Sequence, residues 1–148
     1  MALIKSDHAK GRKQAPIAAE AGNVVAARYE IDLGAIGAAD VVELGILPAN
    51  SRLVDATLVT DGLGGTAITA DVGVMSDAPG ETTASSTVGA EVFDNAAVTA
   101  AGVVRASATA GFLLATTETD RAVGLVLSGT ITGGKAVLIL EYAANGDY

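Results

Sequence analysis

The stretch RLVDATLVTD, residues 52–61, alternates apolar and polar side chains along most of its length. Val54, Ala56 and Leu58 fall on one face of an extended chain, with Val59 as an exception on the other, mostly polar face. A period of two residues is typical of an antiparallel strand that buries one face and exposes the other. The stretch therefore predicts a half-buried β-strand.

Similar β-rich stretches recur from residue 23 onward, separated by short segments rich in Gly, Pro, Asn and Ser. The expected strands cover residues 23–33, 40–47, 52–61, 66–75, 87–94, 102–108, 111–117, 121–131 and 135–143. The last two flank the turn TGG, residues 132–134, and are expected to form a hairpin. No long helix is expected after residue 23.

This series of short strands is typical of an all-β fold. We predict an antiparallel β-sandwich, with a jelly roll as the first choice and another Greek-key sandwich as the alternative. Hydrophobic residues make up 50% of the chain but aromatic residues only 3%, so the core must consist of small and β-branched side chains, which suit sheet-on-sheet packing. A chain of 148 residues is expected to form one domain.

The first part of the chain differs from this pattern. We divide the protein into an extended N-terminal arm, residues 1–22, and a β-sandwich domain, residues 23–148. Residues 1–30 carry a net charge of +2, whereas the whole chain carries −8. Candidate partner-binding residues in the arm are Lys5, His8, Lys10, Arg12 and Lys13.

We expect this arm to be partly flexible, or ordered mainly by a partner, with an acidic protein surface as its target and a solvated tail as the alternative. Its cations lack interleaved aromatic residues, which predicts at most a weak, salt-sensitive contact with nucleic acid. The start of the chain has no apolar region of a secretory signal, and no apolar stretch is long enough to span a membrane.

Sequence motifs of catalysis are not supported. GTITGGKA, residues 129–136, matches the spacing of a phosphate-binding loop, but Ala136 stands where Ser or Thr is required, and a strand is expected where a helix should follow. His8 is the only imidazole and lies in the arm, where nothing is expected to hold it as a base. The chain contains no cysteine. We therefore predict no enzyme activity, no cofactor and no metal site.

Weaker alternatives for a functional site remain at a group of aspartates and at the aromatic residues. Four aspartates recur around two strands expected to be neighbours: Asp55, Asp61, Asp71 and Asp77. They could form a calcium site or an acid–base pair, although no calcium-binding loop motif is present. Phe93 and Phe112 are expected in the core rather than in a sugar-binding platform, and Tyr148 at an interface or a frayed end.

The overall design is that of a charged N-terminal segment followed by a small, Ala-, Gly- and Val-rich β body. The body begins with YEIDLGAIGAADVVELGILPANSRLVDATLVTDGLGG, residues 29–65, continues through DVGVMSD, residues 71–77, and ends with GKAVLILEYA, residues 134–143. In this design the chain resembles the head decoration, or capsid cement, proteins of tailed bacteriophages. These proteins have no fixed motif, so no residue role is carried over.

The resemblance implies a virion structural protein that binds the outside of the major capsid lattice and stabilises the head. It implies two partners, the major capsid protein and further copies of the chain in a homotrimer, and no specific nucleic acid or membrane. Its expected place is the capsid exterior, after synthesis in the host cytoplasm. Two alternatives stay open: another head–tail or tail structural protein, and a non-enzymatic β-sandwich ligand-binding module.

Overall fold

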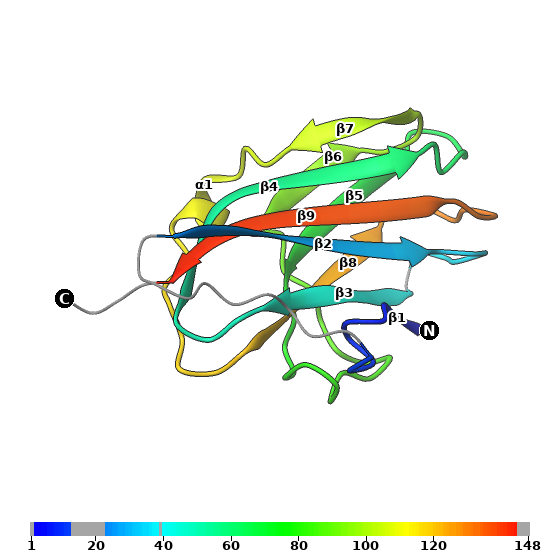
Figure 1. Cartoon of the computed structure of the whole chain (residues 1–148). Helices are drawn as coiled ribbons and strands as arrows, with labels where there is room; N and C mark the ends of the chain where they lie inside the picture. Colours follow the sequence, from blue (N-terminus) through cyan, green and yellow to red (C-terminus); the bar gives the residue numbers. More distant parts are fainter. Residues whose placement is uncertain (1, 13–22, 39, 145–148) are drawn as a thin grey trace.

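Two β-sheets pack face to face in the computed structural model, which describes residues 2–12, 23–38 and 40–144 (Figure 1). The five-stranded sheet contains, in spatial order, β1 (Leu3–Lys5), β3 (Val41–Leu47), β8 (Arg121–Leu127), β5 (Thr69–Val74) and β6 (Phe93–Ala97). The four-stranded sheet contains, in spatial order, β2 (Val24–Asp32), β9 (Lys135–Ala144), β4 (Ser51–Asp61) and β7 (Ala101–Arg105). The prediction of an all-β sandwich is confirmed.

Side-chain alternation explains why the four-stranded sheet packs as it does. In β9 the inward positions are all buried, namely Ala136, Leu138, Leu140 and Tyr142. In β2 every second residue from Ala27 to Ile31 is buried, while the residues between them are exposed. β9 and β2 therefore each supply one apolar face to the space between the sheets, as the sequence pattern predicts. In β4 a register shift between Leu53 and Asp55 interrupts the alternation, so Val54, which was expected on the buried face with Ala56 and Leu58, is 44% exposed.

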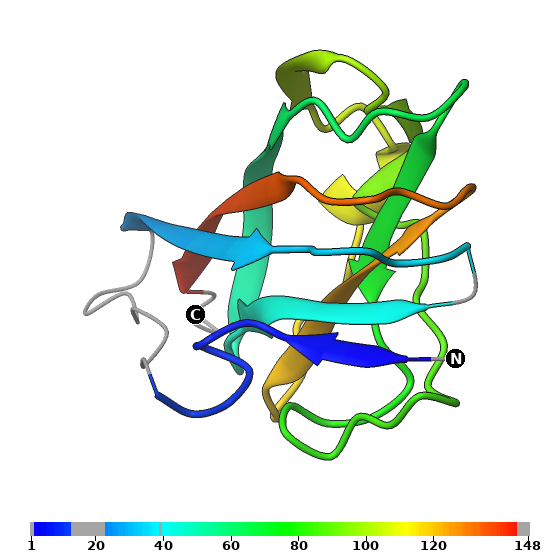
Figure 2. The ribbon, with the colours of Figure 1, turned by 90° about the vertical axis from the view of Figure 1, so that its right-hand side faces the viewer.

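The strands pair in nested order from the ends of the chain inward. β2 pairs with β9, β3 with β8, β4 with β7, and β5 with β6, all antiparallel. The first and last strands of the domain thus lie side by side, and the chain crosses repeatedly between the two sheets (Figure 2). Most contacts that hold the fold together are consequently long-range in sequence.

The predicted C-terminal hairpin is wrong for this reason. β8 lies in the five-stranded sheet and β9 in the four-stranded one, so the residues between them connect the two layers. Both strands have an apolar face that fits the core from either sheet, and local periodicity cannot tell which sheet a strand joins. The strand expected after GTITGGKA does begin at Lys135, so the phosphate-loop interpretation stays excluded.

Residues 111–117 do not form the expected strand. They begin within the short helix α1 (Thr109–Phe112), and Phe112 is 38% exposed rather than part of the core. A Cβ on Gly111 would lie 2.5 Å from the carbonyl oxygen of Glu91, which shows how closely this turn approaches the neighbouring chain. Phe93, in contrast, is buried as predicted. No helix in the described residues is long and apolar enough to cross a membrane.

The outer faces of the two sheets differ. A segment that follows β5 lies over the five-stranded sheet, where Met75 and Val88 join Val41, Ala122 and Leu3 in a second, smaller apolar cluster. The outer face of the four-stranded sheet instead exposes side chains of β2, β4 and β7. The sandwich therefore has one face covered by its own chain and one open face.

Tyr29 of β2 is fully buried and requires a glycine opposite, on β3. Its hydroxyl donates a hydrogen bond to the carbonyl oxygen of Ile46 at 2.6 Å, and burial raises its pKa. A Cβ on Gly45 would lie 2.5 Å from the Tyr29 ring. The ring and its hydrogen bond thus leave no room for a side chain at position 45.

We expect the Gly45→Ala substitution to lower the free energy of unfolding by about 2 kcal/mol, because the added methyl group overpacks the core against an anchored ring. Urea denaturation followed by circular dichroism measures the change. Gly133→Ala is the matched control, since a Cβ there meets nothing within 4 Å. Equal stabilities of the two variants would contradict this account of the core.

Candidate functional site

The N-terminal segment is the element that the sequence predicts to bind a partner. Its residues 2–12 lie against the sandwich. β1 pairs in parallel with β3, and Ser6 N–H extends the pairing by donating to the carbonyl oxygen of Glu43 at 2.9 Å. A turn follows, in which Arg12 N–H donates to the carbonyl oxygen of Asp7 at 2.9 Å. Residues 2–12 thus contact the chain's own body, and a partly flexible or partner-bound arm over residues 1–22 stays a prediction. Residues 13–22 lie outside the described residues.

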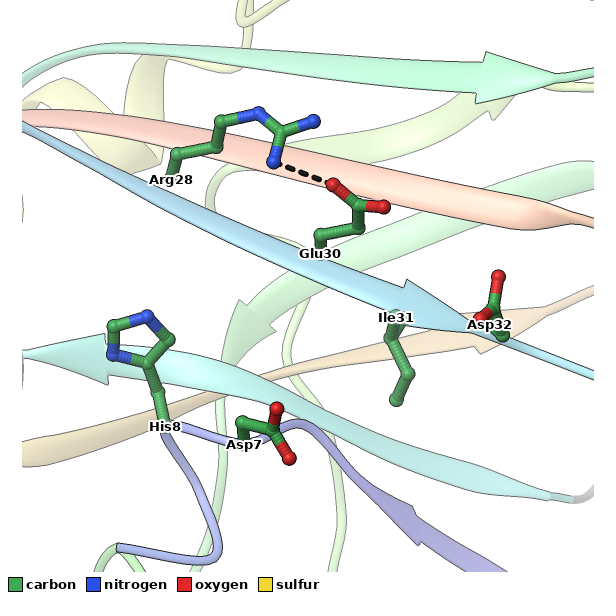
Figure 3. Close-up of a pocket in the computed structure, with 6 residues that line it drawn as sticks. All are labelled: Asp7, His8, Arg28, Glu30, Ile31 and Asp32. Atoms are coloured by element: carbon green, nitrogen blue, oxygen red, sulfur yellow. Dashed lines mark ion pairs between the residues drawn. The ribbon is translucent and has the colours of Figure 1, made fainter. Parts of the chain in front are cut away.

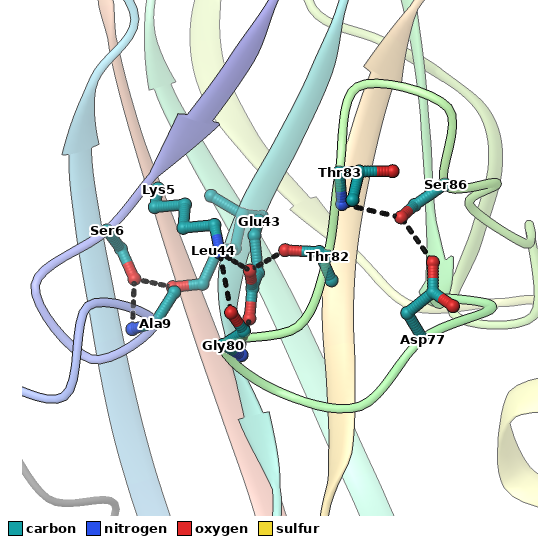
Figure 4. Close-up of polar contacts among 10 residues, drawn as sticks. All are labelled: Lys5, Ser6, Ala9, Glu43, Leu44, Asp77, Gly80, Thr82, Thr83 and Ser86. Atoms are coloured by element: carbon teal, nitrogen blue, oxygen red, sulfur yellow. Dashed lines mark hydrogen bonds and ion pairs between the residues drawn. The ribbon is translucent and has the colours of Figure 1, made fainter.

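A buried carboxylate fastens this segment to the body (Figure 4). The Glu43 side chain has no exposed surface, and one of its oxygens lies 3.5 Å from the Lys5 ammonium nitrogen. The same carboxylate accepts hydrogen bonds from Gly80 N–H, at 3.2 Å, and from the Thr82 hydroxyl. Lys5 also donates to the carbonyl oxygen of Gly80 at 3.1 Å. Glu43 thus joins β1, β3 and the loop after β5.

Ser6 makes a second attachment beside Glu43. Its hydroxyl donates to the carbonyl oxygen of Leu44 and accepts from Ala9 N–H at 3.2 Å, and both Ser6 and Ala9 are buried. Ile4 packs on the main core. The segment therefore adds both polar and apolar contacts to the open edge of β3.

His8 lies against Tyr29 of β2. Its ring meets the Tyr29 ring edge-on, with centroids 4.6 Å apart and planes at 87°. Beside it, a polar hollow of about 320 Å³ separates the N-terminal segment from β2 (Figure 3). The hollow is lined by Asp7, His8, Arg28, Glu30, Ile31 and Asp32.

Charges around this hollow are balanced within the chain. Glu30 lies 2.5 Å from Arg28 and 2.7 Å from Lys135, and these contacts, the Lys135 hydrogen bond first, lower its pKa. Arg12 lies 3.7 Å from Asp7. Glu30 is therefore ionised at neutral pH and unsuited to act as a proton donor. The hollow suits a polar contact with a partner better than acid–base chemistry.

The five predicted binding residues have different surroundings. Lys5 is held by Glu43 and Gly80, and His8 lies against Tyr29. Lys10 and Arg12 are exposed on the turn, and Lys13 is outside the described residues. The exposed positive charge of the described segment is thus concentrated at Lys10 and Arg12. Their role in binding a partner stays a prediction.

The four aspartates considered for calcium do not converge. Each has a contact of its own: Asp55 with Arg105, Asp61 with Lys135 N–H, Asp71 with Asn95 N–H, and Asp77 with the Ser86 hydroxyl. Within the ranges that the structure describes, no group of three or more His, Cys, Asp or Glu side chains is placed to hold a metal ion. Tyr148 lies outside those ranges.

Sequence reasoning missed Glu43, Ser6 and Thr82, the buried polar residues that attach the N-terminal segment and the loop. One signal was present: Glu43 is the single charge inside the otherwise apolar run VVELGIL of β3. A charge at that position requires a buried partner or an exposed edge, and only the folded chain shows which one applies.

Solved structures include chains that are similar to this one. A chain in the capsid of Ralstonia phage GP4 is 40% identical, with a TM-score of 0.92, and the match covers 98% of this chain and 99% of that one. A chain in the capsid asymmetric unit of cyanophage Pam1 is 25% identical, with a TM-score of 0.63, over 88% of this chain and 94% of that one. No family model and no curated protein matches the sequence.

We expect Lys5→Ala to lower the free energy of unfolding by about 2 kcal/mol, because the Glu43 carboxylate stays buried without its cation. Chemical denaturation measures the change, and hydrogen exchange of the amides in β1 should accelerate. Lys10→Ala, an exposed change on the same segment, should stay within about 0.5 kcal/mol of the unmodified chain. If both variants were equally stable, the Lys5–Glu43 contact would not hold the segment.

Proposed function

Because this chain belongs to a family of bacteriophage capsid proteins, we propose that it is a non-enzymatic decoration protein that binds the outside of the major capsid lattice and stabilises the head. The observation that carries the proposal is the match of 40% identity over 98% of the chain. A match of this extent leaves little of the chain for a separate catalytic or ligand-binding unit.

The charge of the chain supports a place on the capsid exterior. A net charge of −8 on 148 residues would be repelled by packaged DNA, whose phosphates attract cationic proteins. On the outside, the same charge keeps a surface protein soluble. The exposed cations Lys10 and Arg12 offer a local contact with an acidic protein surface.

The strand order supports a jelly roll as the scaffold. The eight strands from β2 to β9 divide into the orders β2-β9-β4-β7 and β3-β8-β5-β6, with β1 added at the edge of β3. Two such four-stranded sheets with nested pairing correspond to the double Greek key of a jelly roll. The fold thus offers a rigid body, and the N-terminal segment with Lys10 and Arg12 offers a contact at its edge.

The binding test uses purified chain and phage heads that lack it. The chain should co-sediment with intact heads, and the heads should then withstand a higher temperature before they release DNA. The double variant Lys10→Glu and Arg12→Glu should bind less, because it reverses the exposed charge of the segment. Failure of the unmodified, folded chain to bind heads would contradict the decoration role. If the double variant bound heads as well as the unmodified chain, only the proposed contact through these two residues would be excluded.

We further propose that the chain acts as a homotrimer. Several weak contacts made by one trimer would add up on a repeating lattice through multivalency. Exposed apolar side chains on β2, on β4 and at the end of α1 supply surface for self-association: Val24, Val54, Phe112 and Leu113.

Multi-angle light scattering on the free protein should give three times the monomer mass of 14.6 kDa. Leu113→Asp, which places a charge on a side chain that is 76% exposed, should shift the mass towards the monomer without unfolding the chain. A monomeric mass for the unmodified chain at all accessible concentrations would contradict the trimer and leave the head-binding test unaffected.

A further inference from the structure

The strand β7 lies at an edge of the four-stranded sheet and is open to pairing with a further strand. Four strands lie at edges of the two sheets: β1, β2, β6 and β7. Three of them carry features that discourage further pairing. β1 has only three residues, β2 displays alternating charges, and β6 has a register shift against β5 beside the polar side chains of Asp94 and Asn95. Short length, charge and irregular register are the usual protections of edge strands.

β7 has five residues, one charge at its end and a regular register. Its sequence AGVVR contains no proline and a single charge, Arg105, at one end. Its pairing with β4 runs without a register shift from Thr57↔Arg105 to Asp61↔Ala101. Within the described residues, no strand pairs with its other edge. A regular strand of small apolar residues with a free edge is suited to accept another strand.

The outer face of the sheet ends at this edge in an exposed valine. Val137 on β9, Val59 on β4 and Val103 on β7 form one cross-strand row. Exposure rises along the row from 7% at Val137 to 68% at Val103. One more strand with an apolar residue in the same row would cover Val103 as its neighbours are covered.

We propose that β7 pairs antiparallel with β7 of a second copy of this chain, about a two-fold axis at Val103. A two-fold contact uses the same patch on both copies, so each residue must suit its symmetry mate. In this register Val103 lies opposite Val103, Gly102 opposite Val104, and Ala101 opposite Arg105. The row of valines then continues from one sheet into the other.

Charges favour a second copy as the occupant. Arg105 is the one charge on β7, so no like charges face each other directly across the axis. It would stand opposite Ala101, whose small side chain leaves space for the guanidinium to extend towards Asp61, the next residue in that row. Arg105 already contacts Asp55 on its own β4, but its side chain is 77% exposed. Both ends of the contact thus gain complementary charge.

The contact is small. A pair of five-residue strands buries less surface than the roughly 1,200 Å² of a stable interface, so it forms mainly between copies that are already concentrated. A lateral link between neighbouring copies held on one surface meets this condition. The inference rests on the geometry of β7 and not on the proposed capsid role.

A cysteine at position 103 tests the pairing in the free protein, because the chain contains no other thiol. Directly opposite residues have Cβ atoms close enough for a disulfide, so Val103→Cys should form covalent dimers on mild oxidation, seen by non-reducing electrophoresis. Gly102→Cys is the control on the same strand, since its two cysteines would be offset along the strands by two residues, or about 7 Å, beyond disulfide reach. Val24→Cys, an exposed valine on the β2 edge, is the second control.

A charge change at position 101 separates specific pairing from random collision. In the Val103→Cys background, Ala101→Lys faces Arg105 of the second copy and should slow dimer formation several-fold, whereas Ala101→Glu should accelerate it. Equal rates for Val103→Cys and both controls, or no response to charge at position 101, would overturn the proposal. The proposal would also be overturned if Val103→Lys lost head binding while Val103→Cys gave no cross-linked dimer. In that case β7 would contact a different protein rather than a second copy of this chain.

Discussion

The contacts of the buried Glu43 carboxylate attach the N-terminal strand and the loop after β5 to the rest of this structure. A charge without exposed surface is costly unless cations and hydrogen-bond donors surround it, and here Lys5, Gly80 and Thr82 supply them. Each donor comes from a segment that has little core of its own. The requirement to satisfy one carboxylate therefore orders both the N-terminal strand and the loop after β5 against the same sheet.

Because of these contacts, the outer faces of the two sheets differ in what covers them. The five-stranded sheet is covered by the loop and the N-terminal segment, which complete its outer surface with Leu3, Met75 and Val88. The four-stranded sheet has an open outer face, and within the described residues no strand pairs with the free edge of β7.

The basic N-terminal segment illustrates how burial changes the meaning of charge. The sequence suggests a uniform cluster of cations, but in the structure Lys5 neutralises Glu43 and Arg12 lies near Asp7. The exposed positive charge of the described segment is therefore concentrated on the turn that carries Lys10 and Arg12. His8 contributes an aromatic contact with Tyr29. The segment is thus partly a structural strand and partly a candidate contact surface.

The amino-acid pattern was enough to predict the β class, most strand positions and the inward faces of strands such as β9, because a two-residue period indicates which side chains are buried. It also placed Ala136 where a phosphate-binding loop requires Ser or Thr. Three features became visible only in the folded chain: β8 and β9 join different sheets, residues 111–117 form no strand, and Glu43 contacts Lys5. These outcomes depend on contacts between segments distant in the chain, and the local pattern is the same whichever distant partner is chosen.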